Sequence, residues 1–233
     1  MAQKSSLAAA FEAAFLYTGF FVTRILTLLH LDVPIRALLL KIQPAPSKTD
    51  DIPDINKVIL KTLDENDGGI QAEKLWENGP CLIVVIRRPG CLLCREEASN
   101  VAKYKEQIQS QGVSLAAVVH ERFGAKDFGE KHWSGLPLYF DEKKDMYKIL
   151  GRGKFNWMGL DGLVSLNAYK ALFRARSAGF EGNIKGEGRI LGGLFIMSKD
   201  GTHYEFAEKE WGDHAPIQDV LEVCKSLGAK RKP

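Results

Sequence analysis

Two apolar runs joined by one helical stripe constrain the fold of this 233-residue chain most strongly. The first run, CLIVVI, covers residues 81–86 and is continuously apolar and β-branched, as is typical of a strand buried on both faces. From residue 91 apolar side chains recur on one helical face until Gly112, and a second run, SLAAVV, follows at 114–119. A strand–helix–strand unit of this kind places both strands parallel in one sheet.

The rest of the chain extends this unit into a mixed sheet flanked by helices. A short strand is predicted at 137–140, followed by a helix that ends at Gly151 and an amphipathic helix at 160–176. RILGGLFIMSKDGTHYEF, residues 189–206, has the pattern of a β-hairpin, and a closing helix begins at Pro216. The chain is therefore predicted to have an α/β fold whose sheet becomes antiparallel in its second half.

Cys91 and Cys94 form a C-x-x-C pair at the start of the predicted helix, directly after an RRPG turn. At the first helical turn the Cys91 sulfur would face unpaired backbone N–H groups and the positive end of the helix dipole, which favours the thiolate. Neighbouring positive charge also lowers its pKa, although Glu96 and Glu97 partly cancel that charge. We therefore predict that Cys91 is the exposed attacking thiol and Cys94 the resolving thiol. The predicted supporting residues are Arg87, Arg88, Pro89 and Arg95.

Three other uses of the pair compete with a redox dithiol. A structural zinc site needs four ligands, but Cys81 begins a buried strand, Cys224 is distant, and no histidine lies at close spacing. Two inert buried thiols stay possible, because free cysteine is often buried. A cysteine hydrolase needs a general base, and none of His120, His132, His203 and His214 has a supporting motif. The redox dithiol is favoured, with no metal and no bound organic cofactor.

The charge distribution argues against nucleic-acid binding. Residues 1–49 carry five basic and two acidic side chains, whereas the rest of the chain carries 27 of each sign. A phosphate-binding surface needs a local excess of Lys and Arg, and the body of the chain has none. Four unevenly spaced cysteines are too few for a disulfide scaffold, so a reducing compartment fits better and a cytoplasmic location is predicted.

The first 40 residues are strongly apolar, yet their longest inner stretch without charge, 13–23, is shorter than the roughly 20 residues that cross a bilayer. The near-helical spacing of Phe11, Phe15, Val22, Ile25 and Leu29 predicts an amphipathic helix that packs on a membrane surface or on the body. The predicted organisation is an N-terminal helical segment at 1–41, a linker at 42–56, a domain at 57–229 with a helical insertion at about 152–180, and a basic tail at 230–233.

Six ordered segments carry a family resemblance: KLWENG, VIRRPGCLLCREEA, YFDEKKDMY, GFEGNIKGEG, ILGGLFI and EKEWGD. With them the chain resembles the peroxiredoxin-like type 2 family, particularly its A-type (PAMM) redox-regulatory members, within the thioredoxin-like superfamily. The resemblance implies a thioredoxin-like fold after an apolar N-terminal helix, and redox-active cysteines at Cys91 and Cys94. It also implies an antioxidant role in the cytoplasm, with secretion of some members. A sister branch resembles prostamide/prostaglandin F synthase, which reduces an endoperoxide with NADPH.

The chain departs from the wider superfamily at two positions. Conventional peroxiredoxins have Thr or Ser three residues before the attacking cysteine to orient the peroxide, and this chain has Arg88 there. Arg88 or the more distant Arg189 is expected to take that role. Thioredoxins have a cis-proline opposite the dithiol, where this chain reads Leu191-Gly192-Gly193.

Three functions remain open at this stage. The first is reduction of a small peroxide or disulfide substrate by the dithiol, which an external dithiol or an NADPH-linked reductant resets. The second is NADPH-dependent reduction of a prostaglandin endoperoxide, which needs an apolar pocket near Cys91 that the helix at 160–176 could supply. The third is a redox-sensing binding protein with little turnover.

Overall fold

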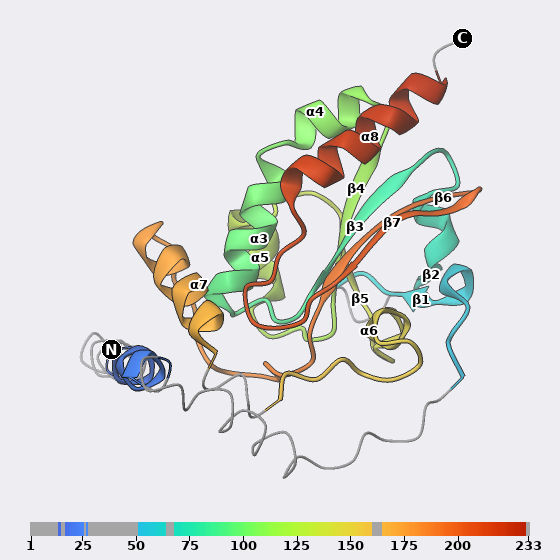
Figure 1. Ribbon diagram of the computed structural model, residues 1–233. Coiled ribbons are helices and arrows are strands. Elements are labelled where there is room, and N and C mark those ends of the chain that lie inside the picture. The colour runs from blue at the N-terminus through green and yellow to red at the C-terminus, as the bar shows by residue number, and fades with distance from the viewer. Residues whose placement is uncertain are drawn as a thin grey trace.

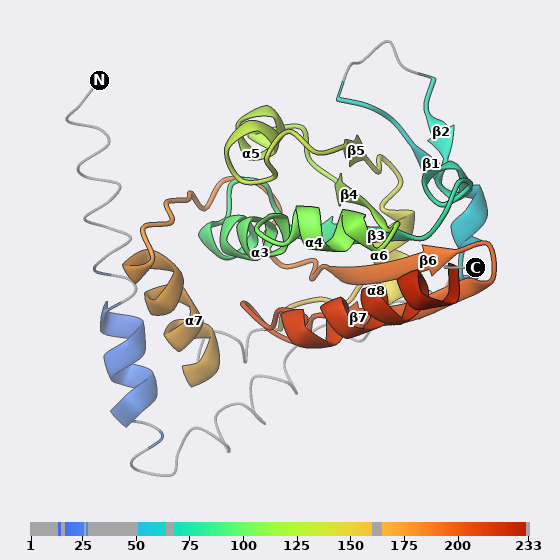
Figure 2. The same ribbon diagram turned by 90° about the horizontal axis from the view of Figure 1, so that it is seen from above.

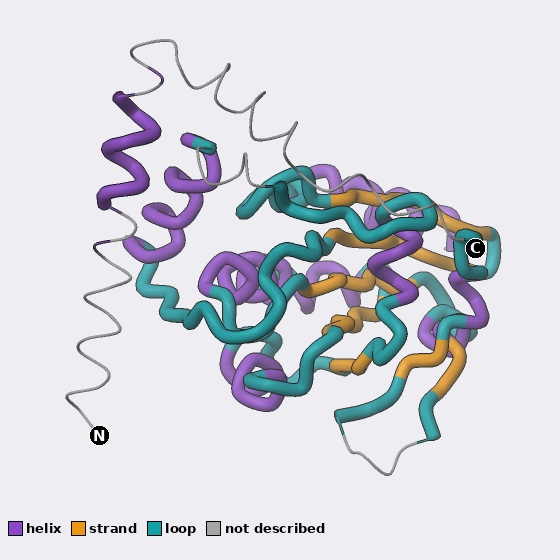
Figure 3. Tube along the Cα trace, turned by 90° about the horizontal axis from the view of Figure 1, so that it is seen from below, coloured by secondary structure: helices purple, strands orange, loops and turns teal. Residues whose placement is uncertain are grey.

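The computed structural model describes residues 14, 17–25, 27, 51–63, 68–159 and 165–231. Most of the predicted N-terminal segment, most of the linker, the start of the helix predicted at 160–176 and the end of the basic tail lie outside the described residues. Figure 3 shows the described helices, strands and loops along the chain.

A five-stranded mixed sheet forms the centre of the molecule (Figure 1). Its order is β5 (Leu138–Phe140), β4 (Ser114–Val119), β3 (Cys81–Ile86), β6 (Gly193–Ser198) and β7 (Gly201–Ala207). β3, β4 and β5 are mutually parallel, whereas β6 runs antiparallel to β3 and to β7. The predicted thioredoxin-like α/β fold, with a sheet that turns antiparallel in its second half, is therefore confirmed. β1 (Ile59–Leu60) and β2 (Ile70–Gln71) form a separate antiparallel pair.

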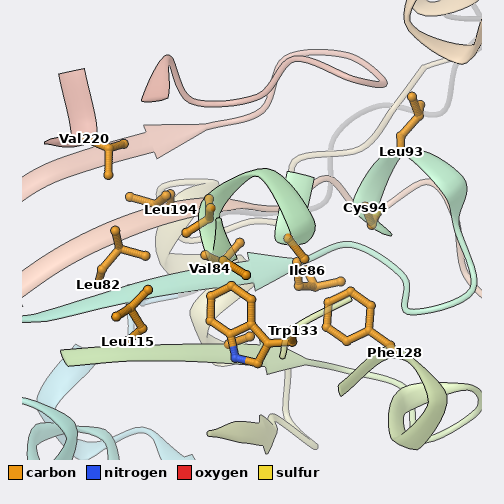
Figure 4. Packing of buried hydrophobic residues seen from close by; sticks show 14 of the residues in the cluster. Leu82, Val84, Ile86, Leu93, Cys94, Leu115, Phe128, Trp133, Leu194 and Val220 are labelled. Atoms are coloured by element: carbon orange, nitrogen blue, oxygen red, sulfur yellow. The ribbon is translucent and has the colours of Figure 1, made fainter. Parts of the chain in front are cut away.

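Both faces of β3 are buried, as its continuous apolar run predicts. Leu82, Val84 and Ile86 pack in one core with residues of helices α3, α4, α5, α7 and α8 (Figure 4). Ile83 and Val85 pack in a second core with α6 and the β1–β2 region. The bounds of the helices are α3 (Leu92–Ala102), α4 (Lys105–Ser110), α5 (Ala125–Lys131), α6 (Asp145–Leu150), α7 (Leu166–Ser177) and α8 (Ile217–Arg231), with short 3-10 turns at Ile55–Lys57 and Ala72–Leu75.

The helices differ from the prediction in three respects. The single helix predicted from residue 91 to Gly112 is divided, because the backbone leaves the helical conformation at Tyr104 and α4 then runs on to contact α8 and β4. α7 begins after Ser165, whose hydroxyl accepts a hydrogen bond from the Ala168 N–H at 3.3 Å and caps the helix. α5 was not predicted, because its seven residues are too short for a clear apolar period.

The described N-terminal helical residues, 17–25, lie beside α7 (Figure 2). The rings of Tyr17 and Phe20 contact the Phe173 ring edge-on, with centroids 5.3 and 5.0 Å apart. Val22 and Ile25, from the predicted apolar stripe, are instead more than half exposed. The contact with the body is thus made by Tyr17 and Phe20 and not by these two residues of the stripe. Among the described residues, no helix is long and apolar enough to cross a membrane.

Gly192 brings β6 close to β3, and we expect its replacement by alanine to destabilise the fold. A Cβ atom at this position would lie 2.1 Å from the Val85 carbonyl oxygen, so the two strands would have to separate. Overpacking of this kind costs about 1–3 kcal/mol of unfolding free energy. Gly68→Ala is the control, because a Cβ there meets open space. Equal urea-unfolding free energies for the two variants would contradict the prediction.

Candidate active site

The turn after β3 places Cys91 at the start of α3. Cys91 is the N-cap residue of this 11-residue helix, in an extended conformation, and its N–H donates to the Arg88 carbonyl at 3.1 Å. Its sulfur therefore lies at the N-terminal end of the helix, where the dipole and the free N–H groups stabilise negative charge. The position is the one that the C-x-x-C pattern predicts.

Arg87 supplies the positive charge that touches the Cys91 sulfur. Its guanidinium donates one hydrogen bond to Cys91 Sγ at 2.8 Å and another to the Gly188 carbonyl at 2.7 Å. The side chain is only 3% exposed and lies 5.6 Å from the centroid of the Trp211 ring. Since the surroundings screen this charge weakly, the contact favours the thiolate strongly.

The other arginines proposed to orient a peroxide make their contacts with groups other than the Cys91 sulfur. Arg88 donates to the carbonyls of Lys185 and Asn183, at 3.1 and 2.7 Å, and so holds that loop beside the helix start. Arg189 lies 5.2 Å from the centroid of the Trp157 ring. Thus Arg87, which was predicted only as a supporting charge, makes the contact with the sulfur, whereas Arg88 is occupied by the loop.

Arg95 and Pro89 fasten the turn. The Arg95 guanidinium donates to the Pro89 carbonyl at 3.1 Å and to the Glu181 carbonyl at 2.9 Å, and it pairs with Asp127 at 3.3 Å. These bonds tie α3, α5 and the loop after α7 to the turn that carries Cys91. These bonds fix the position of the Cys91 thiol and do not change its reactivity directly.

The two thiols have opposite pKa shifts. A hydrogen bond from the Cys94 thiol, together with the charges of Arg87 and Arg88, holds the pKa of Cys91 well below its usual range, against the effect of burial. The same hydrogen bond and burial raise the pKa of Cys94 well above its usual range. The geometry therefore provides one thiolate and one thiol that keeps its proton, which suits an attacking and a resolving cysteine.

Cys91 is not the exposed thiol that the sequence predicted, because it is only 4% exposed. α7 and the loop that follows it close over the turn, which no local pattern indicates. The thiol nevertheless lines a cavity of about 380 Å³. Leu172 and Ile184 and the Trp211 ring give this cavity an apolar lining, and Arg176 and Arg189 add positive charge to it.

A group of titratable side chains lies beside the dithiol: Glu97, Glu208 and His214, with one ligand atom of each within 4.8 Å of the others. Among the described residues this is the group with metal-ligand geometry. Burial raises the pKa of Glu208 to about 7 and lowers that of His214 to about 4. Glu208 already accepts a hydrogen bond from the Gly192 N–H at 3.0 Å and interacts with the charge of Arg87. The protein therefore supplies much of the positive charge that a cation would bring.

Comparison with known proteins places the chain in a family. It is 39% identical to human peroxiredoxin-like 2A over 189 residues, which cover 79% of each chain. It is 38% identical to the zebrafish (Danio rerio) protein of the same name over 187 residues, which cover 78% of this chain and 84% of the relative. The chain belongs to the peroxiredoxin-like 2A family. The family resemblance seen in the sequence is thereby confirmed.

Two further matches are less specific than these relatives. The model of the AhpC/TSA antioxidant enzyme family matches residues 100–210, a range that begins after both cysteines of the C-x-x-C pair. Peroxiredoxin Q of Xanthomonas campestris aligns with a TM-score of 0.47 at 14% identity, covering 78% of this peroxiredoxin-like chain and 98% of the other. Membership of the family supports a thiol-dependent antioxidant role, while neither match bears on the two cysteines.

The sequence did not indicate three side chains of the site in this peroxiredoxin-like chain. The sequence predicts for Glu97 only that it cancels part of the arginine charge, and no sequence pattern indicates a role at the site for Glu208 or Trp211. The sequence position of Glu97 could have placed it at the site, since it lies one turn after Cys94 on the buried stripe of α3. Glu208 and Trp211 follow β7 and reach the site only through the pairing of distant strands.

An ion pair fastens α7, which forms one wall of the cavity, to α3. The Arg174 guanidinium donates to both carboxylate oxygens of Glu96, at 2.9 and 2.8 Å. Arg174→Ala would leave a carboxylate that is only 5% exposed without this partner, so we expect a loss of about 1–3 kcal/mol in unfolding free energy. Lys170→Ala, an exposed change on the same helix, is the control in urea unfolding. If both variants lost the same free energy, the pair would contribute nothing.

Proposed function

We propose that this protein is a thiol-dependent redox-regulatory and antioxidant protein that uses Cys91 and Cys94 to reduce a peroxide or a disulfide. The observation that carries the proposal is the 2.8 Å contact between the Arg87 guanidinium and Cys91 Sγ at the start of α3. A buried cation in contact with a helix-terminal sulfur is an arrangement that maintains a reactive thiolate. No metal or bound organic cofactor is needed for this chemistry.

The reaction with a peroxide has two steps. The Cys91 thiolate attacks one peroxide oxygen, the O–O bond breaks, and with one proton the products are an alcohol and a Cys91 sulfenic acid. The Cys94 sulfur then attacks the Cys91 sulfur, the S–O bond breaks, and a disulfide and water form. An external dithiol reductant returns both cysteines to the reduced state.

Mass-spectrometric mapping after mild peroxide treatment tests the proposal. The reduced full chain is treated with one equivalent of hydrogen peroxide, free thiols are alkylated, and the peptides are analysed without reduction. We expect a disulfide between Cys91 and Cys94, while Cys81 and Cys224 stay unoxidised. Free thiols at both positions, or sulfinic acid at Cys91 without a disulfide, would contradict the proposal.

The apolar cavity supports a second candidate, NADPH-dependent reduction of a prostaglandin endoperoxide. Leu172 of α7 and Ile184 line the space next to Cys91, as an apolar substrate would need. Turnover of the endoperoxide with NADPH and the purified chain distinguishes this activity from simple peroxide reduction. Oxidation of NADPH that does not depend on the endoperoxide would count against it.

A third candidate is a redox-sensing protein in which the dithiol state changes a docking surface. Normal partner binding by the double variant Cys91→Ser, Cys94→Ser would remove its support. A cytoplasmic location and contact of the N-terminal segment with a membrane surface both remain predictions. The exposed Phe21, Val22 and Ile25 side chains are where such contact would occur.

A further inference from the structure

Two buried carboxyl groups beside the dithiol have no part in the reaction described so far. Glu97 of α3 is 3% exposed and Glu208, which directly follows β7, is 2% exposed. Each has an oxygen within 4.8 Å of the other, and His214 completes the group. Buried carboxylates at this distance repel each other, so the pair is most stable when one of the two groups is protonated.

The surroundings of Glu97 indicate that this member of the pair holds the proton. Within the described part of the chain, neither of its carboxylate oxygens has a hydrogen-bond partner, although both are buried. An ionised carboxylate in that position would be very costly, whereas the neutral acid is tolerated. Burial and the neighbouring Glu208 accordingly raise the pKa of Glu97 well above its usual range.

The pair shares one charge network with the two thiols. Glu97 lies one helical turn beyond Cys94 on α3, and the charge of Glu208 acts on Cys94 and on Arg87. Glu208 is oriented by the Gly192 N–H at 3.0 Å. The charged or titratable groups around the pair are Arg87 from the turn, Cys91 and Cys94 from the start of α3, Tyr147 from α6, and Asp213 and His214 from the segment before α8.

Cys94 needs a proton acceptor before it can act as the resolving nucleophile. Its raised pKa keeps it protonated in the reduced protein at neutral pH. The thiolate, not the thiol, attacks sulfur. Since the site is buried, an acceptor from the protein is more effective than bulk water.

We propose that the Glu97–Glu208 pair accepts the proton of Cys94 during disulfide closure and delivers it to the leaving hydroxide. The proposal rests on the proposed peroxide reaction. Cys94 S–H loses its proton to the carboxylate of the pair, its sulfur bonds to the Cys91 sulfur, and the S–O bond of the sulfenic acid breaks. The proton then joins the departing hydroxide to form water, so the transfer itself adds no net proton to the pair and consumes no additional reductant.

Rapid mixing of the reduced full chain with hydrogen peroxide separates the two steps. Sulfenic acid at Cys91 is trapped with a dimedone-type reagent, the disulfide is followed by quenched alkylation, and both rates are measured across a pH series around 7. We expect Glu97→Gln and Glu208→Gln to slow disulfide closure at least about tenfold and to flatten its pH profile. Sulfenic acid formation should change by less than about twofold. Glu96→Gln, which removes a buried carboxylate of the same helix that pairs with Arg174, should retain the wild-type closure profile.

The results separate the proton transfer from the peroxide reaction. Wild-type closure rates and pH profiles in both Gln variants would overturn the proton transfer and leave the peroxide reaction intact. Failure of the wild-type chain to form the disulfide would overturn the proposed function, and the proton transfer with it.

Infrared difference spectra of the wild-type chain supply evidence that does not depend on folding of the variants. The negative charge of Cys91 helps to raise the pKa of both carboxyl groups, and that charge disappears in the disulfide. We therefore expect the band of protonated carboxyl groups to decrease on oxidation near pH 7. An unchanged carboxyl band would contradict the proposal.

Discussion

Replacing Cys91 with serine should lower the peroxide-reduction rate of the full chain at least about a thousandfold, because the serine hydroxyl stays protonated where the thiolate would attack. Cys94→Ser should behave differently. Its attacking sulfur is intact, so one equivalent of peroxide should form sulfenic acid at Cys91 and a second should oxidise it to sulfinic acid, where the reaction stops. Peroxide consumption under turnover with an external dithiol, combined with peptide mass spectrometry, measures both outcomes.

Cys224→Ala is the control for this pair of variants. Burial raises the pKa of Cys224 to about 11, so it is an inert thiol in α8, and its loss should leave the peroxide rate unchanged. Substantial turnover by Cys91→Ser would contradict the assignment of the attacking thiol. Equal loss in the Cys91→Ser and Cys224→Ala variants would indicate that the activity depends only on the fold.

Arg87→Met should slow the attack of Cys91 on peroxide roughly a hundredfold at neutral pH, since it removes the donor that touches the sulfur. The sign of the pH dependence follows from the lowered pKa of Cys91, because the thiolate forms as the pH rises through that pKa. Without the arginine the pKa rises, so the rate profile should shift to higher pH. The deficit should be greatest at neutral pH and should shrink in alkaline solution.

Arg87→Lys is the matched variant, because it keeps the charge but cannot donate in the same geometry to both Cys91 Sγ and the Gly188 carbonyl. We expect it to fall between wild type and Arg87→Met in stopped-flow measurements of the first step. The account would be wrong if the methionine variant kept the wild-type pH profile. A uniform loss at every pH in both variants would instead indicate displacement of the turn.

Local patterns were enough to predict the sheet and the place of the dithiol. The CLIVVI run, the stripe that follows it and the Lys-Asp-Gly turn are each short-range signals, and together they define β3, α3 and the β6–β7 hairpin. The pairing directions then follow from general rules of chain connection. The start of α3 at the cysteine pair needed no information from distant residues.

The details of the site depend on contacts that the sequence does not show. Arg87 and Arg88 are neighbours on a chain leaving a strand, where successive side chains point in different directions, so only the structure shows that Arg87 meets the sulfur. The burial of Cys91 depends on α7 and on the loop after it, both far along the chain. The packing face of the N-terminal helix likewise depends on Phe173 of α7.

The central claim is that Arg87 and Cys94 keep the Cys91 sulfur ionised in the reduced protein. Its most direct test is the alkylation rate of Cys91 by iodoacetamide across a pH series, followed on the Cys91 peptide of the full-length, reduced chain. The account predicts that the rate rises to its plateau below the ordinary thiol pKa of about 8.5, so that the thiolate predominates at neutral pH. A rate that continues to rise at and above that pKa would contradict it.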